Sequence, residues 1–477
     1  MFSTTFLGHQ GWLVHTSRSA ILIDPLLCED FGKIHELGYR VYPPRRWTPE
    51  VAPVLDAVIL THEHDDHFDL PSLAKLERTI PIYLSARSSF AARGVLELMG
   101  FSVRSFEPGH SLVFGDLEVT AFTGDHASID CGDEWDALPF LVRSTEGHGS
   151  FFSMVDITIT QAHVEWAAAK AMRPGLVSWT NNAMDWSHMA DYLSERVEGT
   201  QQCFVKWGVG HKLITSIWGT PAAMVMCAGG FTFNEDRAWL NQRVFCVDVD
   251  QVVANMTKLY PKEKFFAGIP GQTWVMKANK LAAVEMETPW LGAQPRTDWP
   301  SRAKAPTDVP DYEPATGRRQ LAPGELDKLT VQLDELAGSL VGGALFRGLH
   351  SVLATECGDR LPTFAIVARD GDQRRAFEYR ANECRFVPTD KPDVAYLAGI
   401  EVWASDLVAV LDGTLGPIAL TFGRARLWNA LPARFGFEIF PELHRFSHPL
   451  RRPAVYAKTY ERIAAATEGT APVFKHR

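Results

Sequence analysis

The chain has 477 residues, which is too long for one hydrophobic core and predicts two or three domains. Hydrophobic residues make up 46% and charged residues 22% of the chain, which excludes a largely disordered protein. A formal net charge of -10 argues against nucleic-acid binding, and no apolar run approaches the roughly 20 residues of a membrane span.

The chain begins with MFSTTFLGHQGWLVHTS, which lacks the basic and continuously apolar segments of a signal peptide. We read it as a first strand and expect a cytoplasmic location. Seven scattered cysteines without a CxxC pair predict reduced thiols, so we do not count them as metal ligands.

Short β-type runs dominate the first part of the chain, among them SAILIDPLL, DAVILTHEH and GSFFSMVDI. Helix-like stretches lie between and after them, such as PSLAKLERT, QAHVEWAAAKAM and DQVVANMTKLYP. Strands with interspersed helices predict a layered α/β sandwich.

The amino-acid composition changes at residues 288–323, where repeated prolines disfavour both a helix and a central strand. We predict a linker there, between a catalytic domain at 1–287 and a second domain at 324–477. Trp290 and Trp299 indicate that the linker lies against a domain surface. The second domain begins with a long helical pattern and continues with strand-like runs, which predicts a smaller α+β unit.

The stretch THEHDDHFDL places metal-binding side chains directly after the apolar run DAVIL. Its spacing is His62-x-His64-x-Asp66-His67. Successive residues leave the backbone in alternating directions, so His62 and His64 can reach one ion while Asp66 and His67 reach a second. One or two divalent transition metal ions are implied, in preference to a polar turn with solvent-facing histidines.

Two acidic residues, Glu63 and Asp65, alternate with these donors. We expect both to face outward, because the intervening positions of the loop point away from the metals.

THEHDDH resembles the signature of the metallo-β-lactamase superfamily, and FLGHQGWLVHT with ILIDPLL resembles the opening strands of its lactonase-like branch. The resemblance covers much of the first 275 residues. It implies a four-layer αββα sandwich with the metals at its edge. It also implies that Asp24 orients a ligating histidine, although an Asp-Pro turn is an equal alternative.

The resemblance implies two further ligands. His126, in FTGDHAS, would complete a three-histidine site with His62 and His64, and Asp156, in FFSMVDI, would bridge the two ions. Without a metal, a buried carboxylate at the end of an apolar strand would need strong hydrogen-bond donors.

The last ligand of such superfamily members is usually the histidine of a Pro-x-His segment, but here Gln272 stands at that position. His188 or His211 could substitute. Each fits an ordinary histidine better than a ligand, and His188 ranks first because its loop is polar.

The run PDVAYLAGIEVWASDLVAVLDGT followed by ALTFGRARLWN resembles a sterol-carrier-like domain. This weak resemblance implies a lipid-binding tunnel. An interaction or dimerisation module, and therefore a homo-oligomer, is an equal alternative.

These features predict a hydrolase in which a metal-bound hydroxide attacks an ester, lactone, amide or phosphoester, while the catalytic Asp66 orients the nucleophile or passes a proton. Zinc is the expected metal. Iron is the alternative, as a non-heme diiron oxygenase or oxidoreductase that uses O2 and an external electron donor. A binding module with a decayed site ranks last.

We expect a small-molecule substrate, with an apolar or lipid-like one among the options. Its specificity would reside in the insertion between about Thr158 and Met226 and in the way the second domain covers the site.

Overall fold

A computed structural model describes the chain at residues 1–34, 38–122, 137–157, 159–169, 173–181, 190–192, 199–227, 229–233, 238, 240–241, 247–300, 320–340, 344–392, 394–415, 425–432, 449–450 and 452–477. The statements below concern these residues.

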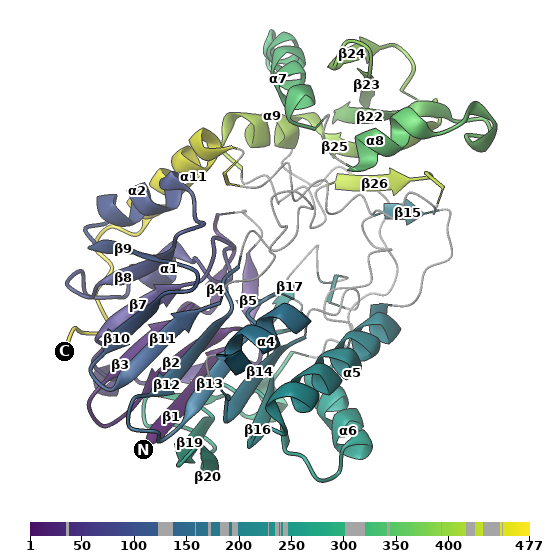
Figure 1. Cartoon of the computed structure of the whole chain (residues 1–477). Helices are drawn as coiled ribbons and strands as arrows, with labels where there is room; N and C mark the ends of the chain where they lie inside the picture. Colours follow the sequence, from purple (N-terminus) through teal and green to yellow (C-terminus); the bar gives the residue numbers. More distant parts are fainter. Residues whose placement is uncertain are drawn as a thin grey trace.

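Two large β-sheets face each other in the N-terminal part (Figure 1). The first sheet consists, in spatial order, of β20 (Lys280–Glu285), β19 (Thr273–Lys277), β1 (Phe2–Gly8), β2 (Gly11–His15), β3 (Ala20–Ile23), β7 (Ala57–Leu60), β8 (Ile82–Ser85) and β9 (Val103–Phe106). The second consists of β10 (Ser111–Phe114), β11 (Leu117–Ala121), β12 (Phe140–Ser144), β13 (Ser150–Ser153), β14 (Leu176–Thr180), β16 (Ala223–Cys227) and β18 (Phe265–Ala267).

Alternating side chains bury both faces of each sheet. In β3, Ile21 and Ile23 point into the core between the sheets, whereas Leu22 joins the core on the outer face, as the two-residue period of a strand requires. Across the central core the rings of Trp12 and Phe151 lie 4.8 Å apart. A sheet that is apolar on both faces needs cover on both.

Helices provide that cover. The outer face of the first sheet packs against α1 (Leu70–Leu73), α2 (Phe90–Leu98) and α11 (Pro453–Ala466), and that of the second against α4 (Gln161–Ala169), α5 (Gly199–Trp218) and α6 (Val249–Leu259). The layers therefore run helix, sheet, sheet, helix. The αββα sandwich predicted from the sequence is confirmed.

A third sheet lies in the C-terminal part (Figure 1). Its order is β15 (Ala190–Tyr192), β26 (Ala425–Asn429), β25 (Tyr396–Trp403), β22 (Leu361–Asp370), β23 (Gln373–Arg380) and β24 (Arg385–Thr389), accompanied by α7 (Glu325–Leu340), α8 (Ala344–Ser351) and α9 (Ala404–Asp412). Because β15 pairs in parallel with β26, the insertion predicted within the first domain contributes an edge strand here.

Smaller elements complete the described structure. They are the sheet of β17 (Phe231–Phe233), β5 (Tyr39–Val41) and β4 (Asp30–Phe31), the pair β21 (Leu291–Ala293) and β6 (Arg45–Trp47), and short 3-10 helices at Pro49–Val51, Arg296–Asp298 and Ala354–Glu356.

The C-terminus returns to the N-terminal sandwich. Helix α11 packs on α2, and Phe474 forms a bridge with Leu76 and contacts the ring of Trp290 at 5.7 Å. Trp290 is buried, and the predicted linker contains the strand β21 and a 3-10 helix where its prolines predicted neither. The domain limits themselves stay a prediction. Among the described helices none is both long and apolar enough to traverse a bilayer.

Candidate metal centre

The candidate site lies at one edge of the sandwich, where three strands of the first sheet end together. Strands β1 and β3 are both antiparallel to β2, and β7 is parallel to β3, so β1, β3 and β7 run in one direction. Their carboxyl ends carry His9, Asp24 and residues 61–69, which we call the His–Asp loop. Since side chains at adjoining strand ends are close in space, this edge concentrates polar groups.

Local hydrogen bonds fold the His–Asp loop into a tight connection between β7 and α1. The backbone amide of His67 donates to the carbonyl of His64 at 2.9 Å. Asp69 then caps α1, because its side chain accepts the amide of Ser72 at 2.9 Å. The loop is thereby anchored at its strand end and at its helix end.

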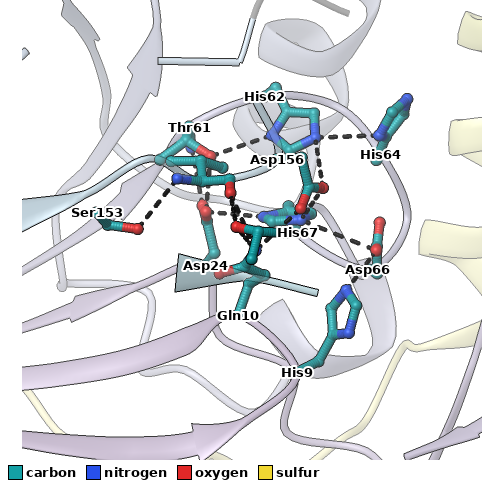
Figure 2. A network of polar contacts seen from close by, with 12 residues as sticks. His9, Gln10, Asp24, Thr61, His62, His64, Asp66, His67, Ser153 and Asp156 are labelled. Atoms are coloured by element: carbon teal, nitrogen blue, oxygen red, sulfur yellow. Dashed lines mark hydrogen bonds and ion pairs between the residues drawn. The ribbon is translucent and has the colours of Figure 1, made fainter. Parts of the chain in front are cut away.

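The first group of donors is His62, His64 and Asp156. Nε2 of His62 lies 3.1 Å from Nδ1 of His64 and 3.7 Å from Oδ2 of Asp156. One ligand atom from each residue falls within 4.8 Å of the others. Asp156 follows β13, so the first sheet supplies the histidines and the second supplies the carboxylate (Figure 2).

The second group is His9, Asp66 and His67, whose donor atoms also lie within 4.8 Å of one another. Nε2 of His9 is 2.6 Å from Oδ2 of Asp66, and Nε2 of His67 is 3.8 Å from the same oxygen. Nε2 of His67 is also 2.9 Å from Oδ2 of Asp156. Figure 2 shows Asp156 between His62 and His67, so this carboxylate links the two groups.

Asp24 contacts two residues of the His–Asp loop, Thr61 and His67. Its carboxylate accepts the amide and the hydroxyl of Thr61 at 2.8 and 2.6 Å, and it lies 2.8 Å from Nδ1 of His67. The bond to Nδ1 leaves Nε2 of His67 facing Asp156 and Asp66. This is the arrangement by which a carboxylate orients a metal-binding imidazole.

The pKa values of His62 and His67 are shifted in opposite directions. Burial, with the neighbouring His67, lowers the pKa of His62 to about 3, so its imidazole is neutral and can ligate. Burial alone would also lower the pKa of His67, but Asp156 and Asp66 outweigh it and raise that pKa well above 6.5.

The pKa values of the two aspartates are lowered, whereas that of His67 is raised. Burial raises the pKa values of Asp66 and Asp156, but the neighbouring imidazoles together outweigh it and hold both below their ordinary range. His67 acts on both carboxylates, with His9 and His64 on Asp66 and His62 on Asp156. Together with Asp24, three carboxylates thus surround the imidazole of His67.

This donor set fits a divalent transition metal. Imidazole nitrogens and carboxylate oxygens suit zinc and iron alike. Excess negative charge in a buried place is costly without a compensating cation, and a divalent ion would supply that compensation. A third group, Asp24, His62 and His67, also places one donor atom from each residue within 4.8 Å of the others, so the division of these residues between two ions stays a prediction.

Gln10 belongs to the site although the sequence did not single it out. Its Nε2 lies 2.9 Å from Oδ1 of Asp156, 2.9 Å from Oγ1 of Thr180 and 3.1 Å from the carbonyl of Val155. Gln10 therefore ties the β1–β2 turn to the Asp156 segment. A His-Gln pair at the end of a first strand was the available signal, but it has no diagnostic spacing.

The prediction that Glu63 and Asp65 face outward is wrong. Both are buried, with 3% and 5% of their surface exposed. Glu63 accepts hydrogen bonds from the amide and hydroxyl of Ser89 and from the hydroxyl of Tyr460. The returning helix α11 covers this side of the loop, where the alternation of directions alone predicts solvent.

The remaining predicted residues fall into two classes. His126 and His188 lie outside the described residues. His211 is buried away from the donor groups, with Nε2 2.7 Å from Oε2 of Glu263, and is a core histidine. Gln272 is also buried, and its Nε2 approaches Sδ of Met286 at 3.9 Å.

Part of the N-terminal sandwich matches a known protein family. Residues 19–215 match the family model for the Beta-lactamase superfamily domain, the superfamily that the THEHDDH motif resembles. No curated protein matches the sequence.

Solved structures with this type of fold are similar at low identity. An isothiocyanate hydrolase from Delia radicum gut bacteria is 18% identical with a TM-score of 0.40, over 58% of this chain and 99% of that one. CmlA, a diiron beta-hydroxylase from Streptomyces venezuelae, is 16% identical with a TM-score of 0.38, over 58% and 54%. Igni18, a metallo hydrolase from Ignicoccus hospitalis, is 15% identical with a TM-score of 0.36, over 57% and 97%.

The sterol-carrier resemblance of the C-terminal part finds no support in these comparisons, since the family match ends at residue 215. A pocket of about 560 Å³ lies between α7 and the third sheet. Charged side chains such as Asp327, Arg374 and Arg375 contribute to its lining, which does not resemble an apolar tunnel.

Proposed function

We propose that this protein is a metal-dependent hydrolase that acts on an ester, lactone, amide or phosphoester bond of a small molecule. The position of Asp156 carries the proposal. Its Oδ2 lies 3.7 Å from Nε2 of His62 and 2.9 Å from Nε2 of His67, so one carboxylate faces both groups of donors. A carboxylate in this position could contact either of two neighbouring metal ions, which together would activate water for hydrolysis.

The residues have separate roles in this proposal. His62, His64 and Asp156, with His126 as a further expected ligand, would hold one ion, and Asp66, His67 and Asp156 would hold the second. A bound divalent ion would act as a Lewis acid and lower the pKa of water. His188 remains the alternative ligand expected from the sequence.

Asp66 is the group suited to proton handling. Its side chain is 16% exposed, more than those of His67 and Asp156, so it faces the open side of the site. Its pKa is held well below the ordinary value, so the carboxylate stays ionised, can accept a hydrogen bond from the attacking water and would pass on a proton rather than keep it. Asp24 acts through His67, by fixing the direction of that ring.

Substrate selection would lie in the insertion between about Thr158 and Met226. The pairing of β15 with β26 ties the insertion to the third sheet. An apolar or lipid-like compound is one option for the substrate.

A non-heme diiron oxygenase is the second candidate. The carboxylate and imidazole side chains of the site, His67 among them, suit iron as well as zinc. It would need O2 and an external electron donor, whereas the hydrolase needs only water.

Metal content and activity distinguish these candidates. The protein is purified without added metal, its zinc and iron are quantified, and hydrolysis is assayed on ester, lactone, amide and phosphoester panels. The proposal is supported if the protein contains zinc and hydrolyses one of these substrates, and if His64→Ala abolishes that hydrolysis. His148→Ala is the control, because that histidine is 37% exposed and its ion-pair partner is Glu146. Two irons and O2-dependent turnover without hydrolysis would favour the oxygenase.

A further inference from the structure

We propose that His9 is a metal ligand and completes the second metal position together with Asp66, His67 and Asp156. This inference rests on the proposed metal-dependent function. It assigns a residue of the β1–β2 turn, which lies outside the HxHxDH motif.

The distances carry the first step. Nε2 of His9 lies 2.6 Å from Oδ2 of Asp66, and His9, Asp66 and His67 each place a donor atom within 4.8 Å of the others. The rings of His9 and His67 are 5.9 Å apart and meet edge to face. Figure 2 shows the His9 ring directed at Asp66 from the side opposite His62 and His64.

The topology explains why His9 can replace the missing last histidine. Strand β1 is antiparallel to β19, with Thr5 opposite Thr273, and the amide of Phe6 donates to the carbonyl of Gln272 at 3.0 Å. The end of β1 and the beginning of β19 are therefore neighbours at one sheet edge. His9 projects from this edge toward Asp66, whereas the Gln272 amide lies against Met286.

The backbone holds His9 in a position that ordinary residues avoid. Its φ is 52°, in the left-handed region. Gly230 packs against it so closely that a Cβ at position 230 would come within 2.6 Å of the Cα of His9. The ring also lies 5.3 Å from that of Phe231. A buried imidazole fixed in this way is preorganised for one direction of bonding.

His9 could instead act only through Asp66, as its hydrogen-bond partner. The two roles differ in whether Nε2 binds the ion. Protein with ¹⁵N-labelled histidine is therefore loaded with ¹¹³Cd, and one-bond coupling between cadmium and the imidazole nitrogens is recorded. His9→Asn identifies the signal, because asparagine tolerates a positive φ. Circular dichroism checks that the variant folds.

Binding of zinc to the metal-free protein supplies the second readout. We expect a cadmium coupling that disappears in His9→Asn, and a loss of more than about 100-fold in affinity for one of two zinc ions, which exceeds the usual 10- to 100-fold effect of a residue that only supports a ligand. The control Gln272→Asn should leave both affinities unchanged.

Three results would overturn the assignment. Wild-type affinities in His9→Asn would remove any role for His9. A smaller loss without a cadmium coupling would make His9 a positioning residue for Asp66. If the wild-type protein bound no metal, the proposed function would fail as well, whereas the first two results leave it intact.

Discussion

The hydroxyl of Tyr460 donates a 2.9 Å hydrogen bond to Oε2 of Glu63, which joins the C-terminal helix to the centre of the His–Asp loop. The two residues are 397 positions apart. Because Glu63 lies between His62 and His64 in the chain, its orientation constrains both histidines. The last helix is therefore structurally coupled to the candidate metal centre.

Tyr460→Phe should weaken this coupling. Loss of a buried hydrogen bond to a carboxylate is expected to lower the free energy of unfolding by about 1–3 kcal/mol, and the zinc affinity should fall with it. Tyr396→Phe is the control, since Tyr396 lies in β25 of the third sheet and its hydroxyl donates to the carbonyl of Lys391. Zinc affinity that falls equally in both variants would contradict a specific link through Glu63.

The effect of Tyr460→Phe should also depend on pH. Burial raises the pKa of Glu63 to about 7, and hydrogen bonds from Ser89 and Tyr460 lower it. Folded protein therefore holds a proton that unfolded protein has lost, so this group's contribution to stability falls as pH rises from 4.5 through about 7. Without the Tyr460 donor the fall should extend to higher pH.

Urea unfolding at about pH 6 and pH 8 measures this dependence. The deficit of Tyr460→Phe relative to wild type should be larger at the higher pH. An equal deficit at both would mean that the hydroxyl does not act through the Glu63 carboxylate.

Asp24→Asn should reduce metal affinity by about 10- to 100-fold, because an amide cannot accept from Thr61 and orient His67 as a carboxylate does. Asp56→Asn is a matched control, since Asp56 accepts the amide of Ala20 at the opposite end of the same strands. Titration of metal-free protein with zinc compares the two. Similar losses would indicate a general effect of sheet stability.

Gln10→Leu should displace Asp156. Nε2 of Gln10 donates to three acceptors, one of which is the Asp156 carboxylate. The variant therefore leaves the buried charge of Asp156 with one hydrogen-bond donor fewer. We expect a loss of about 1–3 kcal/mol in stability and weaker metal binding. Thermal unfolding with and without zinc provides the measurement, and unchanged zinc stabilisation would argue against a role in the site.

The sequence predicted those parts of the site that depend on local spacing. The gathering of donors in one loop follows from the spacing of THEHDDH after a strand, and the sandwich follows from apolar strands with helices between them. His9 could not be found in this way. Its place in the cluster depends on the order of strands in the first sheet.

The burial of Glu63 has a similar explanation. Alternation along the His–Asp loop correctly separates Glu63 from the donors, but it contains no information on what packs against its other side. That partner is helix α11, and contacts across such a separation in sequence leave no periodic signal. The pairing of β15 with β26 was unpredictable for the same reason.

The most direct test of the account is the metal content of the protein purified without added metal, compared with that of His64→Ala. Elemental analysis should find one or two divalent transition metal ions per wild-type chain and the loss of most of that metal in the variant. Wild-type protein that contains no such metal, and binds none when zinc or ferrous iron is added, would contradict the metal centre described here.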